Sequence, residues 1–303
     1  MNVTASLSRR NFVAATALAL GATLIPGLAF ADEKKDSDAS EGVDVTGTWV
    51  MIGADCDDED VAALLALITI MATTTYEFKD DGTGTFKIEV VDGSDDMEAA
   101  AEEATGETAA DAQAEEGDLL QDSEQKIAWE VASDTELSVE TEDGTASTLK
   151  LDGLSLVEVE KDEDSGMEIT SVFARPEDVL SGAWAIATYP DTYDAKHEGI
   201  EGSWSIVALE GMGENEYEDA KWSALMGLLG MAVQMDVNAD GTFTFTVQSD
   251  ADTDPDVSEG QWEEKAADTY TFDVDSDPIE VKIVDGTMRL ESDGYKMVLA
   301  PLA

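Results

Sequence analysis

Cysteine and histidine are almost absent from this 303-residue chain, which has one of each, Cys56 and His197. A single cysteine excludes a disulfide-stapled scaffold, so the stability of the fold must come from packing. We interpret His197 as a surface or linker residue. The Gly-x-Ser-x-Gly, His-Glu-x-x-His, Cys-x-x-Cys and phosphate-loop motifs are also missing. With one cysteine, one histidine and none of these motifs, we expect no enzymatic activity and no cofactor.

Positive charge is the second scarcity. The chain has 16 Lys and Arg against 69 Asp and Glu, a net charge of −53. Nucleic acid is therefore excluded as a partner, because a phosphate backbone requires cationic contacts. An anionic membrane surface is excluded for the same reason. So large a charge keeps a protein soluble but strains its compact state by self-repulsion, and it permits a weak association with divalent cations.

Long apolar runs are missing too. The most apolar stretch, residues 61–72, is too short to span a bilayer. Residues 1–31 resemble a twin-arginine export signal, because Arg9 and Arg10 precede an Ala- and Leu-rich stretch that ends in the small-x-small pattern Ala29-Phe30-Ala31. An ordinary secretory signal or an uncleaved anchor is the alternative. We expect export by the twin-arginine route to the cell envelope or beyond, with residues 32–44 as a disordered tether.

What the chain does contain is one series of turns and aromatic residues that occurs twice. Trp129 to Asp152 spans 23 residues, and so does Trp262 to Asp285. Such self-similarity indicates two copies of one domain. The matching features are Gly47-Thr48-Trp49, Asp81-Gly82, Trp129 and Asp152-Gly153 in the first copy, and Gly202-Ser203-Trp204, Asp240-Gly241, Trp262 and Asp285-Gly286 in the second.

We assign the copies to residues 45–174 and 200–303, joined by a boundary segment at 175–199. Gly182-Ala183-Trp184 is a second possible start for the later copy. Residues 92–125 hold 13 acids and no Lys or Arg, and we read them as a low-complexity acidic insertion, either disordered or a frayed helix.

Each copy combines short strands with one apolar helix after the first strand, near 61–72 and 216–232. Strands at this spacing, joined by consecutive hairpin turns, favour an up-and-down meander that closes into a barrel. The predicted fold class is mainly β, with two tandem antiparallel barrels. The later strands are expected near 127–131, 135–141, 146–151, 154–160 and 167–174, and near 261–265, 269–274, 279–284, 287–291 and 294–300.

The Gly-x-Trp of the first strand, the helix, the Asp-Gly-Thr hairpin, the mid-strand Trp and the late Asp-Gly together resemble the bacterial lipocalin-like domains of the calycin group. The resemblance implies an eight-stranded barrel in which Trp49 and Trp204 close one end as structural plugs. It also implies a small apolar ligand, although such a barrel can be filled by its own side chains.

The two apolar helices are the most suggestive feature for function. We expect them at the barrel mouths as movable lids over an apolar cavity, with Met side chains giving adaptable contacts. Two alternatives are that each helix plugs its barrel as core, and that the helices of the two domains pack on each other. The predicted ligand-binding residues are Leu64, Leu67, Ile68, Met71, Phe86, Trp222, Leu225, Met226, Leu229 and Phe243.

A partial metal motif lies in the second copy. Residues 236–241 supply positions 1, 3, 5 and 6 of an EF-hand loop, but Val247 occupies position 12, which needs a chelating carboxylate. We therefore predict a hairpin turn and no metal site. The function predicted is an exported, non-enzymatic protein that holds a small apolar molecule. The alternative is a cell-envelope or surface interaction module with filled barrels and an acidic, cation-attracting surface.

Overall fold

The computed structural model describes residues 44–56, 65, 68–91, 122–161, 168–226, 231–248, 255–274, 277–292 and 294–303. The expected export signal (1–31), nearly all of the tether and most of the acidic insertion lie outside the described residues, as do Leu64, Leu67 and Leu229.

The first copy is a closed antiparallel barrel in which every strand pairs with its neighbour in sequence and β8 returns to β1. Closure leaves no free sheet edge in the barrel. Its strands are β1 (Gly47–Cys56), β2 (Ala72–Phe78), β3 (Thr83–Val90), β4 (Ser123–Ser133), β5 (Glu136–Thr141), β6 (Ala146–Asp152), β7 (Ser155–Lys161) and β8 (Glu168–Ala174).

The second copy forms a second closed barrel of the same order, in which β16 returns to β9. Its strands are β9 (Gly202–Glu210), β10 (Ala232–Val237), β11 (Thr242–Gln248), β12 (Asp256–Ala266), β13 (Thr269–Val274), β14 (Asp277–Val284), β15 (Thr287–Ser292) and β16 (Tyr295–Pro301). The predicted fold class, two tandem up-and-down barrels, is confirmed. The architecture fits a lipocalin-like barrel.

The duplication extends to individual hydrogen bonds. In the first barrel the backbone N–H of Trp129 donates to Gly82 O at 2.8 Å, and in the second that of Trp262 donates to Gly241 O at the same distance. Both glycines adopt positive φ, 79° and 86°, which is why the Asp-Gly turn recurs. The residues read as a partial EF-hand loop are therefore this β10–β11 hairpin.

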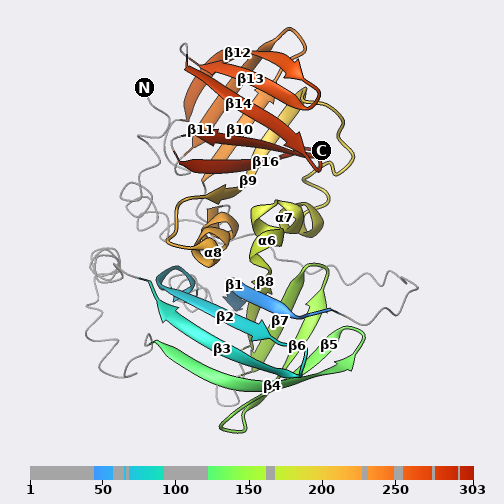
Figure 1. Ribbon diagram of the computed structural model, residues 1–303, viewed down its shortest axis with the longest axis vertical. Helices are drawn as coiled ribbons and strands as arrows, with labels where there is room; N and C mark the ends of the chain where they lie inside the picture. The colour runs from blue at the N-terminus through green and yellow to red at the C-terminus, as the bar shows by residue number, and fades with distance from the viewer. Residues whose placement is uncertain are drawn as a thin grey trace.

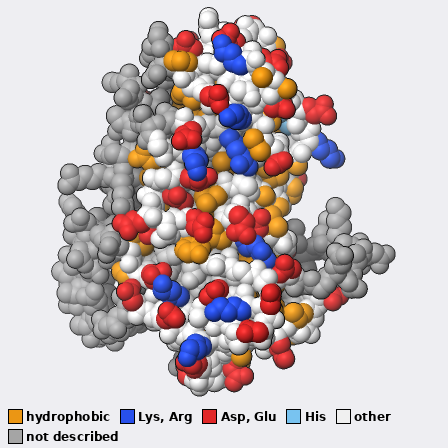
Figure 2. Space-filling view, in the orientation of Figure 1, with side chains coloured by type: hydrophobic (Ala, Val, Ile, Leu, Met, Phe, Trp, Pro, Cys, Tyr) orange, Lys and Arg blue, Asp and Glu red, His pale blue; other side chains and the backbone are white. Residues whose placement is uncertain are grey.

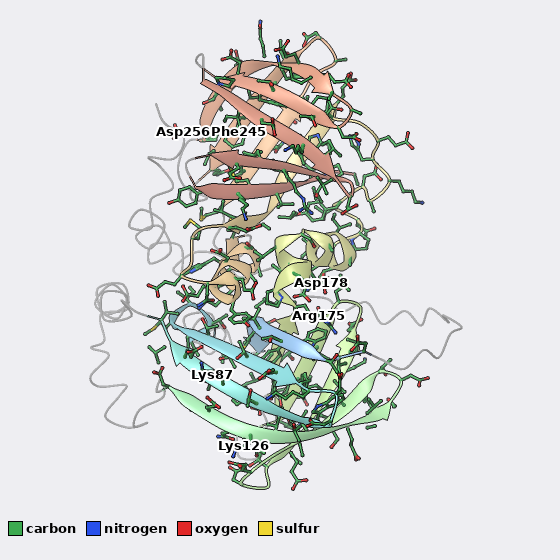
Figure 3. All side chains as sticks on the ribbon, in the orientation of Figure 1. Lys87, Lys126, Arg175, Asp178, Phe245 and Asp256 are labelled. Carbon is green, nitrogen blue, oxygen red and sulfur yellow. The ribbon has the colours of Figure 1, made fainter. Side chains whose placement is uncertain are left out.

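The first-strand tryptophans are buried in equivalent ways. The indole of Trp49 donates to Val45 O at 2.9 Å, and that of Trp204 donates to Ile200 O at 2.8 Å. Arg175, between β8 and α6 (Figure 3), stacks its guanidinium 4.9 Å from the Trp49 ring centroid. His197 packs edge-on against Trp204 at 5.0 Å. The single histidine therefore packs against the first-strand tryptophan of the second barrel.

Three helices lie between the barrels (Figure 1). They are α6 (Pro176–Leu180), α7 (Ala183–Thr188) and α8 (Glu216–Met226). Gly182 precedes α7, so the second possible start of the later copy is helical. Figure 2 shows hydrophobic side chains gathered at the level of these helices. One apolar core joins the outward faces of both barrels to the helices: Val50, Ile52, Val172, Ala174, Val179, Trp184, Ala185, Val207, Ala208, Ala220, Val298 and Ala300.

The predicted helices fit only roughly. In the first copy the described helical residues are 65 and 68–71, and Ala72 already begins β2. In the second, α8 ends at Met226 and Ala232 begins β10. Both predictions ran too far because an apolar helix end and an apolar strand start look alike in sequence. β4 likewise begins at Ser123, inside the predicted insertion, because β3 extends far enough to pair with it.

Candidate binding site inside the first barrel

The interior of the first barrel is apolar near Trp49. Alternate residues of each strand point inward. At this end Trp129 and Leu151 are partly buried, and the other inward apolar side chains are buried. They are Trp49, Met51, Tyr76, Phe78, Ile127, Leu137, Val139, Leu149, Leu156 and Phe173.

A buried carboxyl group lies farther along the same interior. Glu158 follows Leu156 by two positions on β7 and therefore shares its inward face. The Tyr76 hydroxyl, from β2, donates to Glu158 Oε2 at 3.2 Å, and Ser147 of β6 lies close enough to lower the pKa of both groups. Tyr76 and Glu158 are 5% and 8% exposed. We call Tyr76, Ser147 and Glu158 the polar triad.

Burial is the main influence on the charge of the triad. It raises the pKa of Glu158, and the nearby Glu160 carboxylate raises it further, while hydrogen bonds from Ser147 and Tyr76 act in the opposite direction. Burial, followed by the charge of Glu158, also raises the pKa of Tyr76. Among the residues that the structure describes, no lysine or arginine forms an ion pair with Glu158.

Several inward side chains at the end of the first barrel far from Trp49 are only half-buried. Phe86 and Ile88 of β3, and Ser171, which pairs with Glu158 from β8, point inward but are only half-buried. Their equivalents on β11 of the second barrel, Phe245 (Figure 3) and Val247, are 6% and 8% exposed. The two barrels therefore differ at these positions, which are less buried in the first barrel than in the second.

The second barrel replaces each member of the triad with an apolar residue. Tyr76 pairs with Trp49, and Met235 pairs with Trp204 in the same register. Counting from the hairpin between β6 and β7, and from its equivalent between β14 and β15, Ser147 corresponds to Ile279 and Glu158 to Leu290. Leu290 and Met235 are buried in the core of the second barrel. The polar triad therefore belongs to the first barrel alone.

The predicted ligand-binding residues divide between the barrels. Trp222, Leu225 and Met226 of α8 lie with Phe243 in the buried core of the second barrel. Phe86 is half-buried in the first barrel, Ile68 is half-buried and Met71 is buried. The structure does not bring these residues together into one site. Whether they contact a ligand stays a prediction.

The helical segments of the two copies also meet. Ile70, from the first copy, belongs to the same core as Trp222. Lys221 of α8 donates from Nζ to the carbonyl oxygens of Ile70 and Ala72 at 3.2 and 3.1 Å. This is the third arrangement considered from the sequence, in which helices of the two domains pack on each other.

Sequence reasoning missed the polar triad. In the run Leu156-Val157-Glu158-Val159-Glu160 apolar residues occur on both faces of the strand. Two of them, Val157 and Val159, share one face, so the alternation predicts that this face points inward and that Glu158 points outward. The structure instead packs Val157 outside the barrel and leaves Val159 exposed. The available signal was Leu149 and Leu151 on β6, because their cross-strand partners are Glu158 and Leu156.

Among the described residues, metal-binding groups and membrane-spanning helices are both absent. No group of three or more His, Cys, Asp or Glu among them is placed to hold a metal ion. None of their helices combines the length and the apolar character that crossing a membrane requires.

Comparisons with known proteins give no family. No protein-family model matches the chain, and no curated protein matches it. Among solved structures, the DNA polymerase III subunit beta from Pseudomonas aeruginosa is similar at 6% identity over 85% of this chain and 57% of that chain, with a TM-score of 0.13. The DNA polymerase sliding clamp from Pseudomonas aeruginosa with ligand is similar at 7% identity over 97% of this chain and 63% of that chain, with a TM-score of 0.14. The chain thus spans less than two thirds of either protein, and scores so low carry no argument about fold or function.

Proposed function

We propose that this protein is an exported, non-enzymatic binding protein whose first barrel holds a small, mainly apolar ligand. The observation that carries the proposal is the contrast between the two barrels at the end far from the first-strand tryptophan. Phe86, Ile88 and Ser171 are half-buried in the first barrel, whereas their equivalents in the second, Phe245, Val247 and Met297, are buried. An apolar wall with a few convergent polar groups is typical of small-molecule sites in β-barrels.

The second barrel has a supporting role in this proposal. Trp222, Leu225 and Met226 of α8 complete its core, which favours the helix as a plug over the helix as a movable lid. A filled barrel provides a rigid partner against which the first barrel is held.

A neutral fluorescent probe, N-phenyl-1-naphthylamine, tests the proposal. We expect saturable binding to one site per chain. Ile88→Trp, which enlarges a half-buried inward side chain of β3, should weaken binding at least about tenfold, because the added ring occupies the ligand's place. Ser171→Leu, from β8, should act in the same direction.

Lys87→Trp is the matched control, since Lys87 neighbours Ile88 on β3 but points outward. Circular dichroism verifies folding of each variant. Equal loss of binding in the control, or no saturable binding by the folded wild-type chain, would contradict a site inside the first barrel.

The second candidate is an interaction module that uses its acidic surface. It is favoured by the filled second barrel and by the net charge of −53. Its signature is self-association or partner binding that depends on Ca²⁺, measured by analytical ultracentrifugation, in a chain that does not bind the probe.

Export is the remaining part of the proposal, and it rests on the sequence of residues 1–31. Replacing Arg9 and Arg10 with lysine should retain the protein in the cytoplasm if the twin-arginine route is used. Continued export of the double variant would indicate the ordinary secretory route. We also propose that no turnover depends on His197, whose ring packs against Trp204.

A further inference from the structure

We infer that the ligand of the first barrel carries a primary amine, which the polar triad of Tyr76, Ser147 and Glu158 holds inside the barrel while an apolar body lies along the half-buried side chains of Phe86 and Ile88. This inference rests on the proposed function and names the ligand class of the same site.

The first argument is the missing counter-charge. Glu158 is 8% exposed, and among the described residues no basic side chain pairs with it. Burying a carboxylate without a cation is costly, so buried charges in proteins are normally paired. Its described hydrogen-bond partner is the neutral Tyr76 hydroxyl, and the nearby Ser147 is also neutral. A ligand ammonium group would supply the absent charge.

The second argument is the number of acceptors. A primary ammonium group has three N–H donors. The triad offers a Glu158 carboxylate oxygen, the Tyr76 hydroxyl oxygen and the Ser147 hydroxyl oxygen, and both hydroxyls can accept a hydrogen bond. The triad comes from β7, β2 and β6, so it converges on the interior from different sides of the barrel wall.

The third argument concerns the sign of the ligand charge. A ligand carboxylate would lie beside Glu158 and near Glu160, whose negative charge already raises the pKa of Glu158. It would also have to approach a chain with 69 acids and 16 basic residues. Like charges that lie close together repel each other, and the negative electrostatic potential of the whole molecule favours a cationic ligand. An alcohol can donate to Glu158 but leaves the carboxylate charge uncompensated.

The second barrel provides an internal comparison. Met235, Ile279 and Leu290 occupy the three equivalent positions there, and the barrel is filled. Three polar positions of the first barrel are therefore apolar in the second, which is expected if one copy has kept or gained a ligand.

The test measures displacement of N-phenyl-1-naphthylamine by octylamine, octanol and octanoate at about pH 8, where octylamine is protonated. Since charge-assisted hydrogen bonds are stronger than neutral ones, we expect octylamine to bind at least about tenfold more tightly than octanol, and octanoate to bind most weakly. Measurements in about 0.5 M NaCl suppress attraction to the acidic surface.

Glu158→Gln should abolish the preference for octylamine over octanol, because Gln carries no charge. The triple variant Tyr76→Met, Ser147→Ile and Glu158→Leu, which copies the second barrel, should do the same if it folds. Glu140→Gln removes one exposed charge from the outside of β5 and should change nothing. Octyltrimethylammonium carries the same charge without an N–H donor and should bind more weakly than octylamine.

The outcomes separate the two proposals. Binding of the probe and of octanol with no preference for octylamine, or a preference that persists in Glu158→Gln, overturns the amine inference and leaves the binding function standing. Absence of all probe binding in the folded chain overturns both.

Discussion

At the scale of single residues, Lys221 is a lysine that is completely buried, although lysine side chains normally lie on the surface. Its side chain is 0% exposed. Nζ donates to Ile70 O, Ala72 O and Thr73 Oγ1 at 3.1–3.2 Å, so a helix of the second copy uses its three donors on the first copy. The ammonium also lies 5.8 Å from the Trp222 ring centroid. These contacts connect the barrels through a single buried cation.

Burial of Lys221 predicts a pH-dependent stability. Desolvation lowers the pKa of Lys221 to about 8, and the Glu218 carboxylate acts in the opposite direction. Between about pH 8 and the unfolded value near 10.4, the unfolded chain binds more protons at this residue than the folded chain, so its contribution to stability rises with pH. The rise across the window is about 3 kcal/mol.

Urea unfolding of the wild type and of Lys221→Met at several pH values checks this prediction. The free energy of unfolding of the wild type minus that of the variant should increase from about pH 8 to about pH 10. Lys150→Met, at an exposed position of β6, controls for loss of a surface charge. A difference that is flat or falls with pH would show that Lys221 is solvated.

At the scale of elements, the two barrels place a large residue and a glycine on opposite strands of the same strand pair. On paired positions of two neighbouring strands, the first barrel places Gly84 opposite Ile127, and the second places Phe243 opposite Gly260. The large residue thus lies on β4 in one copy and on β11, the equivalent of β3, in the other. Each glycine leaves space for its partner, because a Cβ at Gly84 would lie 3.1 Å from the Ile127 side chain and one at Gly260 would lie 2.6 Å from the Phe243 ring.

This reciprocal arrangement predicts strong position dependence for Gly→Ala. A Cβ at Gly84 would also lie 2.1 Å from Glu77 O, and one at Gly260 would lie 2.3 Å from Asp273 O. Either substitution should lower the free energy of unfolding by about 1–3 kcal/mol, because the backbone itself must shift. Gly53→Ala is the control, since nothing lies within 4 Å of its added Cβ. Thermal unfolding of the three variants measures the effect, and equal midpoints would contradict it.

The same elements show what could be predicted from the sequence. Turn glycines and period-two alternation placed the strands of both barrels within a few residues, because those signals are local. The predicted helices extended too far. α6 and α7 were not predicted, because the boundary segment gains its helical form by packing between the barrels. Their shared core includes Val179, Trp184 and Ala185, and such contacts are not local in sequence.

At the scale of the whole molecule, the candidate site was less accessible to sequence reasoning than the fold. The predicted ligand residues were chosen for apolar character, and those of α8 lie in the filled second barrel. The polar triad joins Tyr76 and Glu158, which are 82 positions apart, and only barrel closure brings them together. The difference between the copies becomes visible only when equivalent positions are compared in three dimensions.

The charge of the whole molecule leads to a prediction about salt. Without residues 1–31 the chain has 14 basic residues and 69 acids, a net charge of −55. The described ion pairs are largely exposed, as for Lys87 with Glu89 and Lys126 with Glu142 on the first barrel (Figure 3). Exposed pairs contribute little, about 0–1 kcal/mol each. Repulsion between the remaining acids therefore dominates the surface electrostatics.

We expect the urea midpoint to rise as NaCl increases from about 0.02 to about 0.5 M, because the screening length then falls well below 10 Å. A variant with Glu130, Glu136 and Glu140 replaced by Gln, all exposed on β4 and β5, should be more stable at low salt and respond less to added salt. Mg²⁺ and Ca²⁺ should act at lower concentration than Na⁺ because they are divalent. If surface ion pairs instead carried the stability, added salt would lower the midpoint, and the triple variant would be the less stable protein at every concentration.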